Sequence, residues 1–265
     1  AIIDLSESSV QPFTDLSERF TIVFNGEFFN YKEHRNDLLK KGIRFKSESD
    51  TEVLLHLYIT EGPSCLQKIN GFFSIAIYDK QEETLFIARD RMGVKPLFIY
   101  QDNDKFIFAS ELKALLEYGI NKEIDRTSLA QYLQLNYIPS PYSIFTNIRK
   151  LKQGNYIIIN KGTIQEKEYY TIPFYQQKQL SIPNISYSEA QNELKKLLAE
   201  SVKKRMVSDV PLGSFLSGGV DSSIIVALAS KYTDKLKTFS IGYKDEPLFD
   251  ETKYAKLVAK KFNTE

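Results

Sequence analysis

Hydrophobic and polar residues alternate in two different rhythms along this chain, and the change between them falls close to residue 173. In the first part, short runs of β-branched and aromatic residues are separated by polar turns, which is typical of strands. The predicted strands are Phe20–Phe24, Phe72–Tyr78, Thr84–Ala88, Pro96–Tyr100 and Phe106–Ala109, followed by a hairpin of Tyr156–Ile159 and Thr163–Glu166. The spacing of the strands that begin at Phe72 predicts an antiparallel meander.

Four helices are predicted among these strands from their apolar edges and from residues that begin or stop a helix. They cover Tyr31–Lys41, Thr51–Glu61, Glu111–Tyr118 and Ser128–Leu135. Ser49 and Glu52 have the spacing of a capping box at the start of the second helix. Helices mixed with antiparallel strands predict an α+β domain over residues 1–172.

The second part of the chain follows a different pattern. Residues 173–186 are rich in Pro, Gln and Asn, and we expect a linker there. Beyond it we expect a helix over Tyr187–Met206 with a capping box at Ser186 and Glu189, a strand over Val210–Leu216, a helix over Asp221–Tyr232, a strand over Lys237–Ile241 and a helix from Glu251. Alternating strands and helices predict the beginning of an α/β domain with a parallel sheet over residues 187–265.

Composition and charge narrow the classes of protein. Of the 265 residues, 42% are hydrophobic and 26% charged, which excludes disorder as the main state. The 35 basic residues nearly balance the 34 acidic ones, so nucleic acid is not an expected partner. No apolar run is long enough to span a membrane, and we do not expect a membrane as a partner. The single cysteine, Cys65, indicates a reducing compartment, so we expect a cytoplasmic protein with Cys65 as a small buried hydrophobe.

One short segment carries most of the chemistry. Ser217–Ser223 reads Ser-Gly-Gly-Val-Asp-Ser-Ser and stands between a predicted strand and a predicted helix. Adjacent glycines let a backbone approach an anion closely, and a helix N-terminus presents unpaired N–H groups to it. Asp221 would repel a bare phosphate, so we expect a desolvated Asp221 that shares Mg²⁺ with phosphate oxygens. The loop has no Gly-Lys pair and is not a Walker A motif.

A second group of candidates lies in the first part. Asn25, Gly26 and Glu27 end a predicted strand, and Asp50 stands at a helix start. An Asn amide together with a Gly N–H is a sensible oxyanion hole, and a carboxylate can hold an α-ammonium group. Taken alone, Asn25–Gly26 is better explained as a type I′ turn and Asp50 as a helix N-cap.

Larger motifs change this balance. Four segments occur in order along the first part: Asn25–Tyr31, Ser49–Glu52, Asn70–Phe73 and Ala88–Leu97. Together they resemble the class II (Ntn-type) glutaminase domain of glutamine-hydrolysing asparagine synthetases. The Ser217–Ser223 loop resembles the PP-loop of N-type ATP pyrophosphatases, which cut ATP between its α and β phosphates. A glutaminase domain followed by this loop is the arrangement of the same synthetase family, which implies an αββα sandwich for the first domain.

The resemblance assigns roles position by position. It implies that Asn25 and Gly26 form the oxyanion hole and that Glu27 and Asp50 contact glutamine. It implies a site for ATP and diphosphate, with Asp221 as the Mg²⁺ residue, at Leu216, Ser217, Gly218, Gly219, Asp221, Ser222 and Ile241. Arg89–Arg91 and Lys95 also match the family, and we expect structural roles for them.

The ends of the chain depart from the family pattern. The family nucleophile is an N-terminal Cys, whereas this sequence opens with Ala1. Cys65 is a poor substitute because it is internal and lies in a helical run. We therefore expect both ends to be cuts through a longer protein, and the polypeptide as given to be inactive in glutamine hydrolysis and in amide synthesis.

The function implied is that of a glutamine-dependent asparagine synthase. Glutamine, aspartate and ATP would give asparagine, glutamate, AMP and diphosphate through a β-aspartyl-AMP intermediate. Two alternatives stay open: a related amidotransferase acting on a sugar or peptide carboxylate, and a non-catalytic glutaminase-like scaffold. The oligomeric state is also open, with a homodimer as one option.

Overall fold

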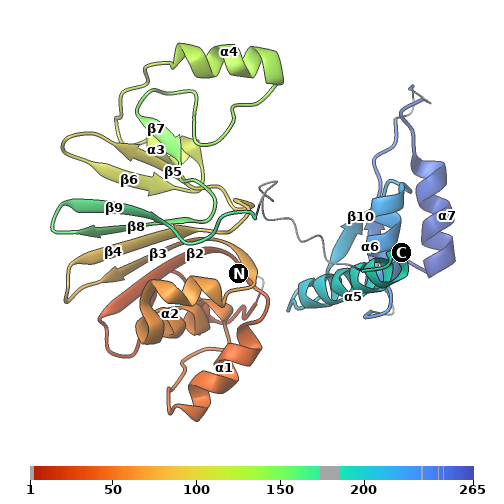
Figure 1. Ribbon diagram of the computed structural model, residues 1–265, viewed down its shortest axis with the longest axis horizontal. Helices are drawn as coiled ribbons and strands as arrows, with labels where there is room; N and C mark the ends of the chain where they lie inside the picture. The colour runs from red at the N-terminus through yellow and green to blue at the C-terminus, as the bar shows by residue number, and fades with distance from the viewer. Residues whose placement is uncertain (1–2, 174–184, 234, 244, 247) are drawn as a thin grey trace. The chain divides into compact units, whose positions relative to one another are not determined.

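The structure is a computed structural model that describes residues 3–173, 185–233, 235–243, 245–246 and 248–265. The chain divides into two compact units, Ile3–Phe174 and Tyr175–Glu265, and each is described by itself (Figure 1). Most of the linker predicted over residues 173–186 lies outside the described residues, so its limits remain a prediction.

The first unit contains two antiparallel sheets. Its larger sheet has six strands in the order β1-β2-β3-β4-β8-β9, and its smaller sheet has three in the order β6-β5-β7. The strands are β1 Phe13–Thr14, β2 Phe20–Phe28, β3 Gly71–Asp79, β4 Thr84–Arg89, β5 Phe98–Gln101, β6 Phe106–Ala109, β7 Ile148–Lys150, β8 Asn155–Asn160 and β9 Thr163–Glu168. The α-helices are α1 Tyr31–Lys40, α2 Asp50–Glu61, α3 Leu112–Leu116 and α4 Arg126–Leu135, and Glu7–Ser9 and Gly62–Gln67 form short 3-10 helices.

The single meander predicted from sequence is wrong beyond its second strand. Strand β4 pairs with β8, which comes about seventy residues later in the chain, instead of with β5. Strands β5 and β6 pair with each other in the second sheet, which β7 completes. Strand spacing along a sequence does not fix which strands pair, because a chain can leave one sheet and enter another through an ordinary turn.

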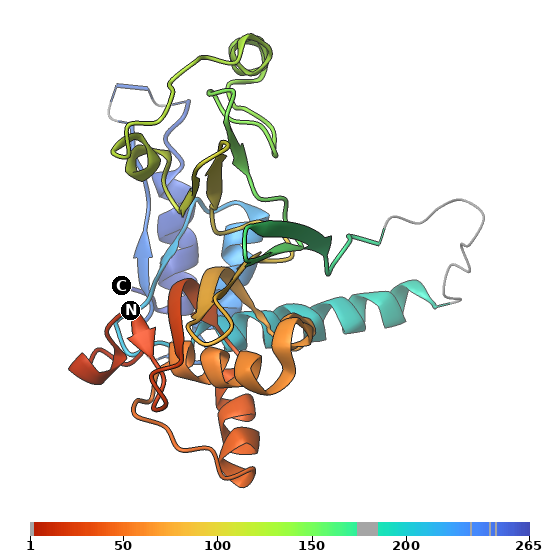
Figure 2. The same ribbon diagram turned by 90° about the vertical axis from the view of Figure 1, so that its left-hand side faces the viewer.

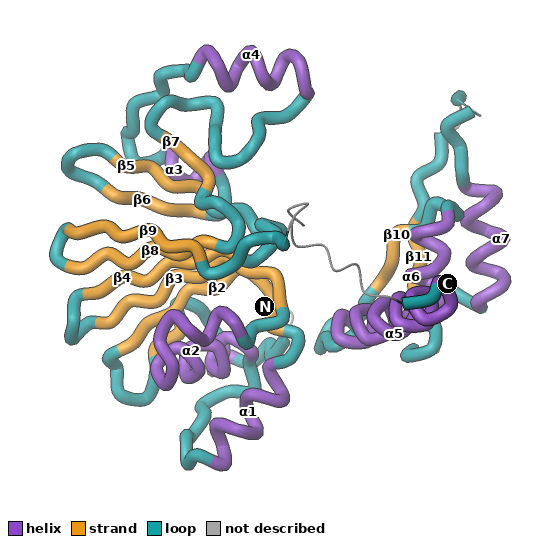
Figure 3. The backbone as a smooth tube through the Cα atoms, in the orientation of Figure 1, coloured by secondary structure: helices purple, strands orange, loops and turns teal. Residues whose placement is uncertain are grey.

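The two sheets and the helices form four layers. Helices α1 and α2 cover one face of the six-stranded sheet, where the rings of Tyr58 and Phe86 lie 4.6 Å apart (Figures 1 and 3). The opposite face packs against the three-stranded sheet through one buried cluster: Ala76, Ile87, Leu97, Ile99, Leu151 and Ile157. Beyond the smaller sheet, α3 contributes the fully buried Leu115 to a further cluster. This is the αββα sandwich expected for an Ntn-type domain.

Helix α2 is buried along most of its length. Ser49 is its N-cap, and the Ser49 hydroxyl accepts a hydrogen bond from the backbone N–H of Glu52. Only this half of the predicted capping box forms, because the Glu52 carboxylate bonds instead to the backbone N–H groups of Lys46 and Ser47. With Ser49 as the N-cap, helix α2 begins at Asp50, one residue earlier than predicted.

The second unit begins an α/β fold. Its elements are α5 Tyr187–Arg205, β10 Gly213–Phe215, α6 Val220–Ala229, β11 Lys237–Phe239 and α7 Thr252–Phe262, with α5 as the long turquoise helix in Figure 2. Strands β10 and β11 are parallel, as the alternating pattern predicts. The capping box at Ser186 and Glu189 is present in full. One buried cluster joins the helices to the end of β10: Val202, Leu216, Val226, Ala229, Leu236 and Ala255.

Among the described residues, no helix combines the length and the apolar character needed to cross a membrane.

Candidate active sites

Asn25, Gly26 and Glu27 lie inside strand β2. Both sequence-based interpretations, a strand end and a type I′ turn, are wrong, because β2 continues to Phe28, which pairs with Gly71 of β3. Every residue of β2 from Phe20 to Phe28 has a partner in β3. This long-range pairing outweighs the local turn preference of an Asn-Gly pair.

Gly26 is required by the close approach of β2 and β3. A Cβ atom at this position would lie 2.1 Å from the carbonyl oxygen of Phe72 and 2.9 Å from the Cα atom of Phe73. These are backbone atoms of a paired strand, so a side chain here would push the two strands apart. The fold therefore requires glycine at position 26 whether or not this residue takes part in catalysis. Its place in an oxyanion hole stays a prediction.

Asp50 is the first residue of α2 and is only 5% exposed. The N-cap of α2 is Ser49, so the prediction that Asp50 is the N-cap is wrong. The Oδ2 atom of Asp50 instead accepts a hydrogen bond from the backbone N–H of Phe28 at 3.0 Å. Burial raises the pKa of Asp50 to about 6, and the charge of Glu27 also raises it. A buried carboxylate whose ionisation is disfavoured by a neighbouring carboxylate favours binding of a cation. The structure thus brings Glu27 and Asp50 together at one end of β2.

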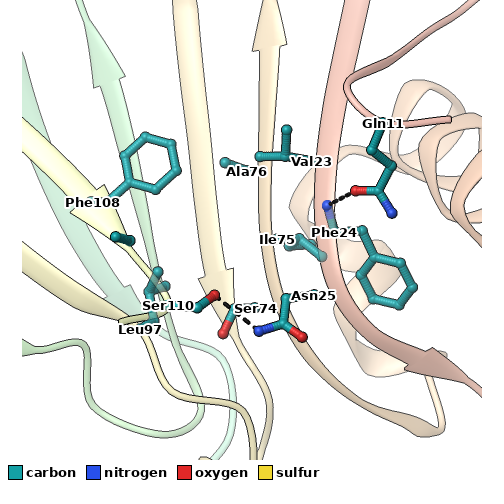
Figure 4. A pocket seen from close by; sticks show the side chains of 11 residues that line it. Gln11, Val23, Phe24, Asn25, Ser74, Ile75, Ala76, Leu97, Phe108 and Ser110 are labelled. Atoms are coloured by element: carbon teal, nitrogen blue, oxygen red, sulfur yellow. Dashed lines mark hydrogen bonds between the residues drawn. The ribbon is translucent and has the colours of Figure 1, made fainter. Parts of the chain in front are cut away.

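The Asn25 side chain faces a cavity of about 270 Å³ that is lined by residues of both sheets (Figure 4). Its Nδ2 atom donates a hydrogen bond to Ser110 Oγ at 2.9 Å. Most of the lining is apolar, from Val23, Phe24, Ile75, Ala76, Leu97, Phe108 and Ala109. No local pattern in the sequence points to Ser110, because it follows β6 and lies 85 residues from Asn25.

The second candidate site is the loop between β10 and α6. Gly219 is the N-cap of α6, and the helix begins at Val220, so Asp221 lies in its first turn. Ser217 Oγ accepts a hydrogen bond from the backbone N–H of Gly219 at 3.3 Å and lies 3.0 Å from Ser222 Oγ. These hydrogen bonds between residues close in sequence hold the loop in a compact turn. The first-turn N–H groups of α6 have no acceptor within the helix and point toward the loop.

Gly218 is the residue that makes this turn possible. Its φ angle is +84°, in the left-handed region that favours glycine. A Cβ atom here would also lie 2.5 Å from the carbonyl carbon of Tyr254 in α7. Gly219 has a φ of −68° and no contact shorter than 3.4 Å at its Cβ position, so only one glycine of the pair is demanded by the fold.

A cavity of about 300 Å³ adjoins the loop and brings together three of the predicted ATP residues, Leu216, Ser217 and Ile241. Aromatic side chains line much of it: Phe215, Phe239, Tyr243 and Phe249. The backbone N–H of Leu216 bonds to the Phe239 carbonyl, and its carbonyl accepts from Ser240 Oγ at 2.6 Å. A ligand could therefore use only the second lone pair of the Leu216 carbonyl oxygen.

Asp221 is exposed, and the desolvated carboxylate expected from sequence is not found. Within the described part of the chain, no group of three or more His, Cys, Asp or Glu side chains could hold a metal ion. A single exposed carboxylate suits Mg²⁺ only if further oxygen ligands come from a bound phosphate or from water.

The segment that begins at Arg89 has the structural role expected for it. The Arg89 guanidinium donates to the carbonyl oxygens of Gly93, Lys95 and Leu151. Asp90 is 1% exposed and accepts backbone hydrogen bonds from four residues: Phe73, Met92, Val94 and Lys95. The charged groups of Arg89 and Asp90 therefore both bind backbone groups of the protein.

Cys65 is a buried structural residue, as expected. It is fully buried, and burial raises the pKa of its thiol to about 12. A thiol that stays protonated at neutral pH is a poor nucleophile.

Each of the two units is similar to a known protein family. Residues 1–170 match the family described as glutamine amidotransferase domain, and residues 193–265 match asparagine synthase. The chain is 37% identical to asparagine synthetase (glutamine-hydrolysing) 1 of Bacillus subtilis, over 98% of this chain and 40% of that protein. It is 39% identical over its whole length to 53% of a Methanocaldococcus jannaschii protein that is provisionally named asparagine synthetase (glutamine-hydrolysing) 2. The chain thus spans about half, or less, of the length of these curated relatives.

Among solved structures, glutamine phosphoribosylpyrophosphate amidotransferase from Bacillus subtilis matches with a TM-score of 0.48 and 19% identity, over 90% of this chain and 50% of that one.

The αββα fold and the family match over residues 1–170 show that the chain belongs to the glutamine amidotransferase domain family. Residues 193–265 are similar to the asparagine synthase family, and the two relatives named above carry the name asparagine synthetase (glutamine-hydrolysing).

Proposed function

We propose that the protein carrying this chain is a glutamine-dependent asparagine synthase. Glutamine, aspartate, ATP and water would be converted to asparagine, glutamate, AMP and diphosphate. The observation that carries this proposal is that one chain joins two matched families: a glutamine amidotransferase domain in which Glu27 faces the buried Asp50, and an asparagine synthase unit with a glycine loop at the N-terminus of α6.

In the first unit, Glu27 and Asp50 would hold the α-ammonium group of glutamine. Asp50 is fixed by its hydrogen bond from Phe28, so its carboxylate has a defined direction. The Asn25 amide and the Gly26 N–H would stabilise the oxyanion that develops on the side-chain carbonyl of glutamine. Cys65 is not the nucleophile of this reaction, since its thiol is fully buried.

In the second unit, the loop and the first turn of α6 would receive the diphosphate of ATP. The N–H groups of that turn and the hydroxyls of Ser217 and Ser222 are hydrogen-bond donors for phosphate oxygens. The aspartate side-chain carboxylate would attack the α-phosphorus, giving β-aspartyl-AMP and diphosphate. Ammonia would then attack the activated carbonyl and displace AMP. The neighbouring aromatic cavity suits the adenine base.

The residues present fit Mg²⁺ bound jointly with diphosphate. The Asp221 carboxylate is exposed, and among the described residues no hydrogen bond or ion pair occupies it. Carboxylate oxygens are the hard ligands that Mg²⁺ prefers, and phosphate oxygens and water would complete its coordination. Bound there, the ion would neutralise charge on the leaving diphosphate. In this proposal Asp221 holds the ion, and the backbone N–H groups of α6 orient the phosphates.

Partners other than glutamine, aspartate and ATP are not part of the proposal. A cytoplasmic location remains a prediction from the single cysteine, and a homodimer remains one option for assembly.

One experiment distinguishes the proposed function from its two alternatives, a related amidotransferase with another acceptor and a non-catalytic scaffold. The full-length protein is supplied with ATP, Mg²⁺ and ammonia, and diphosphate release is measured with aspartate and, separately, with sugar and peptide carboxylates. The proposal expects release with aspartate only. Release with another carboxylate alone would identify a different amidotransferase, and no release with any acceptor would favour a non-catalytic scaffold.

A further inference from the structure

The amide of Asn25 is held from the opposite sheet. Its Nδ2 atom donates to Ser110 Oγ at 2.9 Å, and the two residues lie 85 positions apart in the sequence (Figure 4). Asn25 belongs to β2 of the six-stranded sheet, whereas Ser110 directly follows β6 of the three-stranded sheet. This hydrogen bond therefore bridges the two sheets at the edge of the cavity.

Ser110 has a firm support on both sides. The residue before it, Ala109, pairs with Phe98 of β5. Helix α3 begins two residues after it and carries Leu115, which is fully buried. A hydroxyl held between a paired strand and an anchored helix can fix the direction of a more exposed partner.

The other polar side chains that line the cavity have different partners. Ser74 Oγ donates to the Pro96 carbonyl at 2.8 Å. Gln11 Oε1 accepts from the backbone N–H of Phe24 at 2.6 Å, and its amide nitrogen lies 3.4 Å from Thr51 Oγ1. Among the described residues, Ser110 is thus the polar side chain of this cavity that contacts the Asn25 amide.

A primary amide has two N–H groups in one plane, so a bond to one of them sets the direction of the other. The terminal torsion of an Asn side chain is broad and is restrained mainly by its partners. Asn25 is an exposed residue, so packing alone restrains its amide weakly. The bond to Ser110 supplies the missing restraint.

We infer that Ser110 is a positioning residue for glutamine hydrolysis: by accepting one N–H of the Asn25 amide, it aims the second N–H at the oxyanion that forms on glutamine. This inference rests on the proposed function, because it needs Asn25 to act as an oxyanion donor. Ser110 itself does not touch the substrate.

The test compares variants of the full-length protein in glutamine hydrolysis. Removing an oxyanion donor costs about 100- to 1000-fold in kcat, and a donor that is present but misdirected should cost less, about 10-fold. We expect Ser110→Ala to lower kcat by about that factor while the KM for glutamine changes less than about twofold, because Glu27 and Asp50 are untouched. Ser110→Thr keeps the hydroxyl and should restore most of the loss.

Ser74→Ala is the matched control. Ser74 lines the same cavity and also loses a hydroxyl hydrogen bond in this variant, but that bond goes to the Pro96 carbonyl. We expect lower thermal stability with kcat nearly unchanged. An equal fall in kcat for Ser74→Ala and Ser110→Ala would assign both effects to general loosening of the cavity and overturn the inference.

A double-mutant cycle gives the sharpest result. If Ser110 acts through the Asn25 amide, Ser110→Ala should have no further effect on kcat in an Asn25→Ala background. A full 10-fold loss in that background, or a higher kcat for Ser110→Ala alone, would overturn the inference. Asparagine synthesis supplied with ammonia should be equal in wild type and Ser110→Ala.

The same data separate this inference from the function it rests on. If the wild-type protein hydrolyses glutamine and Ser110→Ala does so equally well, the positioning role fails and the proposed function stands. If the wild-type protein does not hydrolyse glutamine, the proposed function fails as well.

Discussion

The two candidate sites reach their geometry in opposite ways. The site in the first unit is assembled from distant parts of the chain: the interior of β2, the start of α2 and the turn after β6. The site in the second unit is one continuous loop that is closed by hydrogen bonds between residues at most five positions apart. The first site depends on the packing of a whole sandwich, whereas the loop of the second is closed by local hydrogen bonds and packs against α7 at Gly218.

Burial differs in the same way. Asp50 is 5% exposed, and its pKa is raised to about 6, whereas Asp221 is exposed at the N-terminus of α6. A buried carboxylate stores unfavourable energy that a bound cation can relieve. An exposed carboxylate gains a cation without that initial cost, so its site can remain open to solvent until the ligand arrives. The first site is therefore pre-formed at some cost in stability.

The largest expected effect follows from the close approach of β2 and β3. Gly26→Ala places a Cβ atom 2.1 Å from the Phe72 carbonyl oxygen and should cost about 3 kcal/mol of stability in the first unit. Calorimetry should show the transition of that unit about 10 °C lower. Gly219→Ala is the control, because its Cβ meets nothing closer than 3.4 Å. Equal losses in the two variants would show that the close approach is not what fixes Gly26.

Asp221→Asn should separate the two sites functionally. It removes the charge that would hold Mg²⁺ and should lower diphosphate release by at least about 100-fold in the full-length protein. Glutamine hydrolysis and the melting temperature should stay unchanged, since Asp221 is exposed. Survival of ATP cleavage in this variant would remove Asp221 from the metal site.

Asp50→Asn should weaken function and strengthen the fold at once. The amide oxygen can still accept from Phe28, but the charge that in our proposal attracts the α-ammonium group is lost, so the KM for glutamine should rise about 10- to 100-fold. At pH 7.5 the variant should be more stable, by on the order of 2 kcal/mol, because an ionised Asp50 is costly in the folded state. A lower melting temperature would contradict this account.

The pH dependence follows from the same group. The pKa of Asp50 is about 6 in the folded protein against an ordinary value of 3.8, so folding favours its protonated form. The stability that this group contributes is present below about pH 4 and is lost as the pH rises through about 6. Activity runs the other way: kcat/KM for glutamine should fall as the pH drops below about 6, because the carboxylate takes up a proton. Asp50→Asn should remove both dependences.

The smallest effect concerns the two helix caps. Ser49 caps α2 and is 1% exposed, whereas Ser186 caps α5 in a complete capping box at the surface. Each Ser→Ala change should cost about 1 kcal/mol. Ser49→Ala should cost more, since it also leaves the buried Ser47 hydroxyl without one of its partners, at 2.8 Å. Thermal denaturation of both variants would rank them.

The sequence predicted the loop site better than the strand site, for a physical reason. The Ser217–Ser223 turn is set by nearby residues, so its place between a strand and a helix was readable directly. Asn25 and Gly26 look locally like a turn, and only the facing strand β3 makes them part of a strand. The Asn25–Ser110 contact depends on how two sheets stack, which no local pattern encodes. The exposure of Asp221 was missed because a loop's burial depends on what packs over it.

Product analysis of the full-length protein with glutamine, aspartate and ATP tests the central claim most directly. Separate amidotransferase and loop sites acting in sequence require asparagine, AMP and diphosphate in equal amounts, with at least as much glutamate. Formation of ADP and phosphate instead, or amide synthesis without any AMP, would contradict the assignment of the loop to diphosphate and of the protein to asparagine synthesis.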